Sequence, residues 1–363
     1  MRLTILEHLY RQPGPYTSVY LDTSRDSELA QRKVALRWRE AATALADQGA
    51  PEADITAIRD LVEVLRPEGP SGHAIFAADG VVRLAAELEG PPRREIHRYA
   101  PLPHAMPLIA QHRETIPHVL VVTDRVGADV TAVGYDGDAL RREIEGRTWP
   151  IRKVQAGGWS HRRYQQAAEE TWERNAAAVA RATTEAAHAI GAKVVLVAGE
   201  ERARSELLHA LGPDLQAEVI EVPGGGRAAG IDQEAFQAEV AKLLADRAAA
   251  EVSAVEDRFR EELGQHDKAA AGFEGTVRAL QLAQAEVVLV NNDDPAANGT
   301  LFAGPEPGEL GLTRDELRGE AVEDRADAVL VRAAAATDAQ VTMVPPEELT
   351  LPDGLAALLR YRL

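Results

Sequence analysis

The chain carries the stretch GGWSHRRYQQAAEETWERNAAAVARATTEAAHAIGAKVVLVA at residues 157–198, and this stretch decides the class of fold. After two glycines comes a long run without Gly or Pro that is rich in Ala, Glu and Gln, which predicts one helix over 162–190. Gly191 is a residue type that commonly ends helices. The apolar run 193–198 then predicts a buried strand, so a long helix leads directly into a sheet.

The segments on either side of this helix extend the same pattern. Residues 118–123 read HVLVVT, a nearly continuous apolar run of the kind found in a strand covered on both faces, and 128–133 predict its hairpin partner. After residue 198 the sequence predicts a helix at 201–211, a strand at 217–222 and a helix from 232 to about 263, which spans a domain boundary. This β-α-β-α order predicts a mainly parallel sheet covered by helices.

The two ends of the chain predict mixed structures. In the first part we expect helices at 3–10, 28–46 and 55–65, and strands at 16–21, 73–77 and 81–88. Asp79-Gly80 is suited to the tight turn between the last two strands. In the last part we expect helices at 275–283 and 321–336, strands at 286–290 and 340–344, and a closing segment at 355–363.

The expected fold class is therefore α/β and α+β in three domains, in keeping with a length of 363 residues. The first domain, residues 1–116, is an N-terminal α+β domain. The second, residues 117–254, is a mixed sheet with helices on both faces and a long helix after a Gly-Gly loop. The third, residues 255–363, is an α-β-α sandwich.

The composition excludes several classes of protein. With 45% hydrophobic and 27% charged residues, the chain is expected to be globular. The absence of cysteine excludes disulfides, thiolate zinc sites, iron–sulfur clusters and a cysteine nucleophile. No apolar run is long enough for a membrane span, and Glu7 stands where a signal peptide needs an apolar run. We therefore expect a cytoplasmic protein with no membrane partner.

The charge is strongly acidic, with one local exception. A net charge of −18 argues against a DNA-binding protein or a general nucleic-acid coat, because phosphate neutralisation drives such binding. Between residues 141 and 163, however, seven basic residues face only two glutamates. The basic residues are Arg141, Arg142, Arg147, Arg152, Lys153, Arg162 and Arg163. Any contact with RNA is therefore expected to be local to this segment.

Gly157-Gly158-Trp159 lies inside the basic segment and has two interpretations. In the first it is a turn before a helix whose N-cap is Ser160, because serine oxygen accepts a backbone amide at a helix start. In the second it is an RNA-contacting loop, because an exposed indole between cationic residues combines a stacking plane with phosphate-pairing charge. The flanking cations are Arg152, Lys153, Arg162 and Arg163.

Other motifs favour ordinary structural roles. Residues 224–227 (GGGR) lack the Lys and Ser/Thr of a phosphate-binding loop, so we expect a plain loop. Residues 291–294 (NNDD) and Asp22 follow strands, where such side chains commonly form turns. The histidines show no metal-ligand spacing, and no G-x-S-x-G occurs. The sequence therefore predicts no metal, no cofactor and no catalytic residue.

Two C-terminal motifs indicate a resemblance to a known protein family. Residues 272–280 read GFEGTVRAL ahead of a predicted strand, and 353–361 read DGLAALLRY. Together with a central domain that has a basic Gly-Gly loop before a long helix, they make the chain resemble the bacterial branch of the archaeo-eukaryotic class 1 release factor and Pelota superfamily. This branch includes Balon-like ribosome hibernation factors.

The resemblance implies a protein that occupies the ribosomal A site. The first domain would face the decoding centre, the central loop the peptidyl-transferase centre, and the third domain elongation factor Tu or another translational GTPase. Gly157 and Gly158 match the first two positions of the Gly-Gly-Gln loop of the family, and Trp159 replaces its glutamine. Indole has one N–H donor and no acceptor with which to orient a hydrolytic water, so peptide release is not expected. The stop-codon motif Asn-Ile-Lys-Ser is absent as well.

The resemblance therefore predicts an A-site-binding factor without Gly-Gly-Gln chemistry, for ribosome hibernation or rescue. Its predicted contacts with ribosomal RNA are Arg152, Lys153, Gly157, Gly158, Trp159, Arg162 and Arg163. One alternative is a peptidyl-tRNA hydrolase or tRNA nuclease that acts on stalled ribosomes. Another is a small-molecule α/β protein whose ligand binds at the carboxyl ends of the strands, near Gly199 or Pro223.

Overall fold

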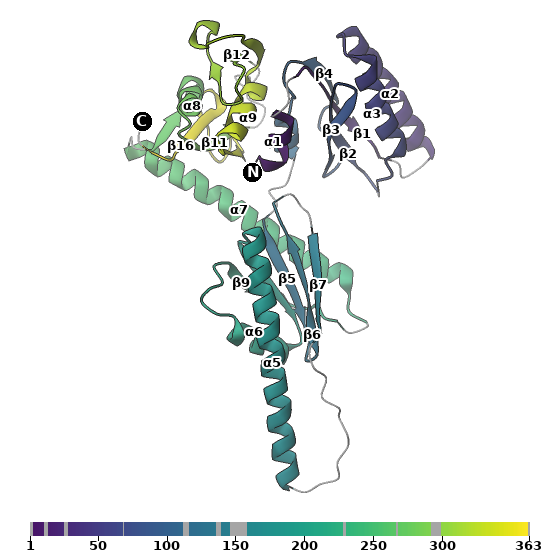
Figure 1. Cartoon of the computed structure of the whole chain (residues 1–363), viewed down its shortest axis with the longest axis vertical. Coiled ribbons are helices and arrows are strands. Elements are labelled where there is room, and N and C mark those ends of the chain that lie inside the picture. The colour runs from purple at the N-terminus through teal and green to yellow at the C-terminus, as the bar shows by residue number, and fades with distance from the viewer. Residues whose placement is uncertain are drawn as a thin grey trace. The chain divides into compact units, whose positions relative to one another are not determined.

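The computed structural model describes most of the chain and shows a mixed α/β protein of the expected fold class (Figure 1). The described residues are 3–10, 14–24, 28–67, 69–111, 116–135, 139–145, 158–227, 230–265, 268–291 and 299–361, with the backbone alone for 4–5, 28–29 and 158–169. The chain forms two compact units. The central unit is residues 114–251, and the outer unit combines residues 1–113 with 252–363.

The sheet of the central unit has the strand order β7-β6-β5-β8-β9. Its strands are β5 (His118–Thr123), β6 (Gly127–Val133), β7 (Ala139–Glu145), β8 (Val194–Gly199) and β9 (Glu218–Glu221). Strands β5, β8 and β9 are parallel, whereas β6 and β7 are antiparallel additions. The parallel part and the β5–β6 hairpin confirm the sequence expectation. Strand β7 was not expected, because its sequence ALRREIE carries two adjacent arginines and is almost wholly exposed at the sheet edge.

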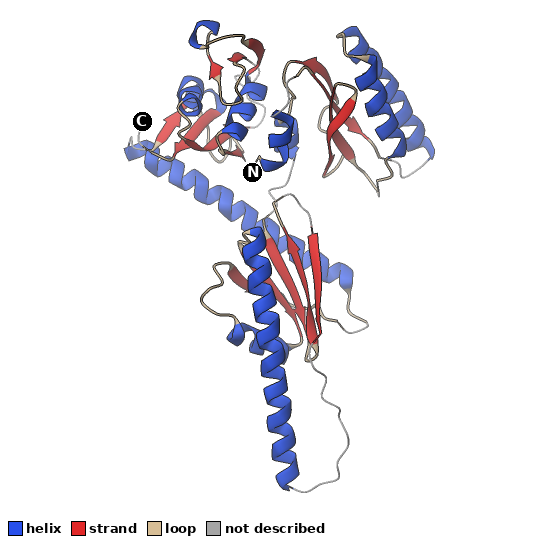
Figure 2. Ribbon diagram, in the orientation of Figure 1, coloured by secondary structure: helices blue, strands red, loops and turns tan. Residues whose placement is uncertain are grey.

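Helices cover both faces of this sheet, as Figure 2 shows. The helices are α5 (Gly158–Ile190), α6 (Glu201–Ala210) and the first part of α7 (Gln233–Gln265). Val195 of β8 is buried with Val179 of α5 on one face, and the next residue, Leu196, is buried with Val240 of α7 on the other. This alternation follows from the strand geometry, in which successive side chains point to opposite faces.

The first part of the outer unit is an antiparallel sheet in the order β3-β2-β1-β4. Its elements are α1 (Thr4–Tyr10), β1 (Tyr16–Asp22), α2 (Glu28–Asp47), α3 (Glu52–Val64), β2 (Gly72–Ala78), β3 (Val81–Leu88), β4 (Ile96–Ala100) and α4 (Met106–Gln111). Asp79 and Gly80 have φ angles of 54° and 74°, which confirms the predicted tight turn between β2 and β3.

The last part of the outer unit is a sheet in the order β10-β16-β11-β15, with α8 and α9 among its helices. The elements are β10 (Ala269–Ala271), α8 (Gly272–Gln281), β11 (Ala285–Asn291), β12 (Thr300–Ala303), β13 (Leu310–Gly311), β14 (Val322–Arg325), α9 (Ala326–Ala336), β15 (Gln340–Val344) and β16 (Leu355–Leu359). The predicted start of the helix 321–336 was wrong. Residues 322–325 pair with β12 as a strand, and the helix begins only at Ala326.

The two parts of the outer unit share one hydrophobic core. Leu6 and Leu9 of α1 are fully buried in the same cluster as Leu330 of α9. Polar contacts reinforce it, since the backbone N–H of Leu102 donates to the Asp324 carboxylate over 2.9 Å. The expected division of this unit into domains 1–116 and 255–363 stays a prediction.

Candidate functional site

Helix α5 extends past the sheet on which it packs. Asn175 Nδ2 donates to the backbone oxygen of Arg125, in the turn after β5, over 3.2 Å, which marks the level of the sheet edge. The part of α5 that precedes this level continues beyond the strands (Figure 1). At a rise of 1.5 Å per residue, the stretch from Gly158 to Glu170 is about 18 Å long. The start of α5 is therefore well placed to reach a partner beyond the sheet.

The predicted RNA-contacting residues that the structure describes lie at this end. Gly158, Trp159, Arg162 and Arg163 occupy the first two turns of α5. Arg152, Lys153 and Gly157 lie outside the described residues. Positions 159, 162 and 163 have the i, i+3, i+4 spacing, so they are neighbours on one side of the helix. The helix thus brings one aromatic and two cationic positions together.

The expected N-cap at Ser160 was wrong. Helix α5 already begins at Gly158, so Ser160 lies inside its first turn. A serine caps a helix only when its own backbone is non-helical, and nothing in Gly158 or Trp159 prevents helical dihedral angles. Part of the Gly-Gly-Trp stretch is therefore helix rather than loop.

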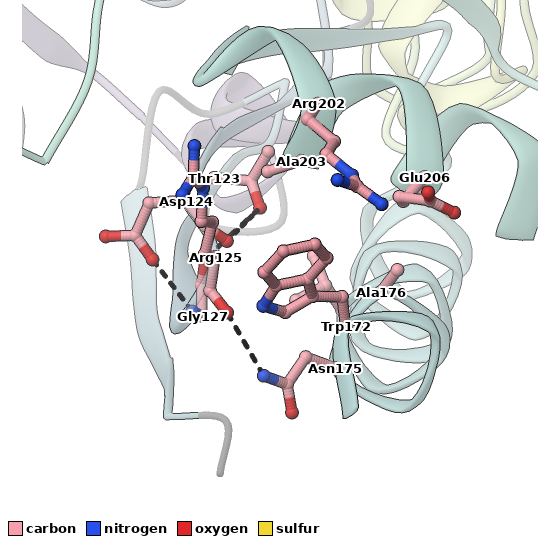
Figure 3. A pocket seen from close by; sticks show the side chains of 11 residues that line it. Thr123, Asp124, Arg125, Gly127, Trp172, Asn175, Ala176, Arg202, Ala203 and Glu206 are labelled. Carbon is pink, nitrogen blue, oxygen red and sulfur yellow. Dashed lines mark hydrogen bonds between the residues drawn. The ribbon is translucent and has the colours of Figure 1, made fainter. Parts of the chain in front are cut away.

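A cation–π cluster secures α5 where it meets the sheet edge (Figure 3). The Arg202 Cζ lies 4.3 Å from the centroid of the Trp172 ring, and the Arg125 Cζ lies 5.7 Å from it. Arg125 also forms an ion pair with Glu200. These contacts join α5 to the β5–β6 turn and to α6. The sequence alone did not indicate this cluster, because both arginines are distant from Trp172 along the chain.

At this end of the sheet, the backbone of the turn after β5 packs closely against the end of β8. The Asp124 carboxylate accepts the N–H groups of Val126 (2.7 Å) and Gly127 (2.9 Å), which fixes the turn after β5. Gly199 has φ 116°, and a Cβ there would lie 1.9 Å from the Thr123 carbonyl oxygen. The small-molecule alternative expected a ligand near this glycine. The neighbouring pocket is lined by Thr123, Trp172 and the two arginines that contact the Trp172 ring.

The GGGR stretch is a loop, as expected, and its arginine is used inside the fold. Arg227 pairs with Asp129 (3.2 Å), Asp124 (3.3 Å) and Glu143 (2.7 Å) and is only 17% exposed. Burial lowers the pKa of Arg227, but the three carboxylates outweigh it and raise the pKa above its ordinary value. Arg227 therefore links the β5–β6 turn, β6 and β7.

Two other predicted turn residues also have structural roles. Asn291 donates to the carbonyl oxygens of Val344 (3.0 Å) and Leu349 (2.9 Å) and accepts from Leu351 N–H (2.9 Å). Asp22 accepts from the backbone N–H of Ser24. Residues 292–294 lie outside the described part.

Neither a metal-binding group nor a membrane-spanning helix is found among the residues that the structure describes. Within that part of the chain, no group of three or more His, Asp or Glu is arranged to hold a metal ion. Likewise, none of the helices described there is both long and apolar enough to span a membrane.

Comparison with known proteins assigns the family. Residues 117–265 match the model of bacterial archaeo-eukaryotic release factor family 2. The uncharacterized protein Rv2629 of Mycobacterium tuberculosis strain H37Rv is 30% identical over 370 residues, which cover 99% of this chain and 97% of that protein. This chain belongs to the bacterial archaeo-eukaryotic release factors. The predicted resemblance to the bacterial branch of the superfamily is thereby confirmed.

Solved structures of the wider superfamily are also similar to this bacterial release-factor homologue. A model of ribosome-bound archaeal Pelota with ABCE1 shares 17% identity, covers 99% of this chain and 94% of that chain, and has a TM-score of 0.42. Dom34 of S. cerevisiae shares 11% identity over 81% and 79% of the two chains, with a TM-score of 0.40. Because these TM-scores are low, the family assignment depends on the family match and the mycobacterial relative.

Proposed function

We propose that this member of the bacterial archaeo-eukaryotic release factors binds the ribosomal A site without hydrolysing peptidyl-tRNA, and that it acts in ribosome hibernation or rescue. The start of α5 carries the proposal. Gly158 and Trp159 stand where the family has the second glycine and the glutamine of its loop. They begin the stretch of α5 from Gly158 to Glu170, which is about 18 Å long and precedes the level of the sheet edge. The family's reactive position is thus presented to a partner, but with an indole in place of the amide.

The residue types at this end suit RNA binding rather than hydrolysis. Indole offers one N–H donor and no acceptor, so Trp159 is unable to position a water as the family's glutamine does. An indole does stack on nucleic-acid bases, which is worth about 1–3 kcal/mol per base. Gly157 and Gly158 would allow close approach to RNA. The residues proposed to pair with ribosomal RNA phosphates are Arg152, Lys153, Arg162 and Arg163.

The remaining parts would contact other components of the ribosome. Residues 1–116 would face the decoding centre. Residues 255–363 would bind a translational GTPase, for which elongation factor Tu is the bacterial candidate. This assignment also places the protein in the cytoplasm, where ribosomes work. The acidic remainder of the chain would stay clear of RNA or contact basic ribosomal proteins.

Ribosome cosedimentation with matched charge reversals tests the proposal. The Arg162→Glu, Arg163→Glu double variant should bind ribosomes at least a hundredfold more weakly, because two phosphate contacts become repulsive. The control is Arg174→Glu, Arg181→Glu, which makes the same charge change at exposed positions where α5 lies over the sheet. The control should bind as tightly as the parent protein.

Two results would contradict the proposal. Full ribosome binding by the Arg162→Glu, Arg163→Glu variant would show that the start of α5 is not the contact. Release of peptide from peptidyl-tRNA on stalled ribosomes saturated with the parent protein would support the hydrolase alternative instead.

A further inference from the structure

The outer unit contains a cavity of about 700 Å³ that the proposed ribosomal role does not use. One side is formed by β4, α4 and the segments next to them, within residues 93–111. The other side is formed by Val290 and Asn291 at the end of β11, by Met343 of β15, and by Arg325 and Asp327 around the start of α9. Its volume falls within the range of small-molecule sites, which is about 300–1,000 Å³.

The cavity is cationic although the chain is strongly acidic. Its charged lining residues are Arg93, Arg94, Arg98, Arg325, Glu95 and Asp327. Both of these acids already have cationic partners. Glu95 accepts from Arg37 over 3.0 Å, and Asp327 accepts from Arg325 over 2.6 Å. Arg98 is likewise paired with Asp324, so the uncompensated positive charge comes from Arg93 and Arg94.

The two arginines at the start of this side are available to a ligand. Arg93 and Arg94 are exposed, and their guanidinium groups have no ion-pair partner among the residues that the structure describes. The side chain of Gln111 accepts the backbone N–H of Arg93 over 3.1 Å, which ties the segment to α4. The backbone of Arg93 is therefore fixed by α4, whereas the charges of Arg93 and Arg94 have no ion-pair partner in the described part of the chain.

Three nitrogen atoms of the cavity lining are buried without a hydrogen-bond partner among the residues that the structure describes, and one of them is His97 Nε2. Arg98 donates one end of its guanidinium to Asp324, but its Nη1 has no partner within the described part of the chain. The same holds there for the Nδ1 atom of His104, a residue only 6% exposed. Buried polar atoms in native proteins almost always have partners. Because Arg98 carries only donors, its missing partner is an acceptor.

His104 is held in a fixed position. Its backbone N–H donates to Ser18 Oγ over 3.1 Å, and its carbonyl oxygen accepts from Tyr20 Oη over 2.7 Å. Its Nε2 lies 3.1 Å from Asp327 Oδ2. Although burial raises the pKa of Asp327, hydrogen bonds from His104 and Arg325 outweigh it, so this pKa is lowered and the carboxylate stays charged.

Part of the remaining lining is apolar and can take a ring. Ile96, Met106, Val290 and Met343 all line the cavity. Methionine adapts its shape and makes favourable sulfur–aromatic contacts. We propose that this cavity binds a phosphorylated nucleotide, with its phosphates at Arg93, Arg94 and Arg98 and its base against the methionines. Inorganic phosphate alone would leave the apolar part of the volume unused.

Isothermal titration calorimetry of the full chain tests this site. The probes are ADP, GDP, adenosine and pyrophosphate. At least one nucleotide should bind once per chain, and adenosine and pyrophosphate should each bind at least tenfold more weakly. The Arg93→Glu, Arg94→Glu variant should lose at least tenfold in nucleotide affinity. The matched control is Arg32→Glu, Lys33→Glu, an adjacent exposed pair on α2, which should stay within twofold of the parent.

Several outcomes would overturn the proposal. These are no heat from ADP or GDP at millimolar concentration, equal losses in both variants, or pyrophosphate that binds as tightly as the nucleotides. Binding of a single-stranded RNA oligonucleotide without nucleotide binding would also overturn it. Both variants replace exposed side chains, so unchanged thermal unfolding midpoints will show that any loss of affinity is local. Ribosome cosedimentation is a separate measurement, so failure here leaves the role of α5 unaffected.

Discussion

The central unit has two glycine-rich stretches with arginines, and they lie at different places in the fold. In residues 224–227, Arg227 is 17% exposed and pairs with the carboxylates of Asp124, Asp129 and Glu143. In residues 157–163, by contrast, the arginine positions lie on turns of α5 that extend beyond the sheet (Figure 1).

The difference shows how arginines that pair within the fold can be distinguished from arginines that are candidates for binding a partner. An arginine whose charge is matched by carboxylates of its own fold has little charge left for a ligand, and its removal leaves those carboxylates uncompensated. Arginine positions on the turns of α5 before the sheet edge are instead where we propose that a partner binds. Variants of the two stretches test this contrast in stability and in binding.

The largest effect is expected from Arg227→Ala. Removal of the cation leaves three carboxylates close together without compensation, so the free energy of unfolding should fall by about 3 kcal/mol. Urea unfolding measures this change. The control is Arg142→Ala, since Arg142 pairs with Glu185 over 3.5 Å and both side chains are more than 60% exposed, so its cost should be below about 0.5 kcal/mol. Equal losses in both variants would remove the contrast.

A second, smaller effect should distinguish the glycines. Gly225 has φ 70°, and a Cβ there would lie 2.5 Å from the ring of the buried Phe236. Gly225→Ala should therefore cost about 2 kcal/mol in unfolding free energy, from backbone strain and displacement of the ring. Gly158→Ala replaces a glycine at the first position of α5 and should change stability by less than about 0.5 kcal/mol. The reverse order of the two costs would contradict the assignment of Gly225 to structure.

The smallest effect is expected from Trp159→Ala. Loss of one stacked base should weaken ribosome binding about tenfold, or about 1.4 kcal/mol. Filter binding with purified ribosomes measures it, and stability should not change. Trp172→Phe is the aromatic control. Trp172 also lies on α5, but its ring contacts Arg125 and Arg202 of the same fold at the sheet edge. If the control weakens binding as much as Trp159→Ala, stacking by Trp159 is not the cause.

Much of the fold was predictable from local pattern. The apolar runs of β5 and β8, the long helix α5 and the Asp79-Gly80 turn each have a short-range signal. Several elements lacked such a signal, β7 and β14 among them. Strand β7 is almost wholly exposed and carries two adjacent arginines, and the sequence of β14 resembles the first turn of α9 until its pairing with β12 is known. Both are strands because of neighbours elsewhere in the chain.

The candidate site was predictable only in part. The order of glycines, tryptophan and arginines at 157–163 is visible in the sequence, and so is the missing glutamine. The extension of α5 beyond the sheet was not visible, because it depends on where Asn175 meets the turn after β5. The three ion pairs of Arg227 were equally hidden, since its partners lie about 100 residues earlier in the chain.

The sequence by itself determined the acidic charge, the absence of cysteine chemistry, the helices and strands with a clear local pattern, and the loss of the family's glutamine. These properties depend on residue identity and on spacing over a few positions. Only the tertiary structure decided that Arg227 is neutralised, and that Arg98 and His104 line a cavity with nitrogens that have no partner among the described residues. Charge compensation and cavities depend on which distant residues come within a few ångströms of each other, and that distance exists only in the folded chain.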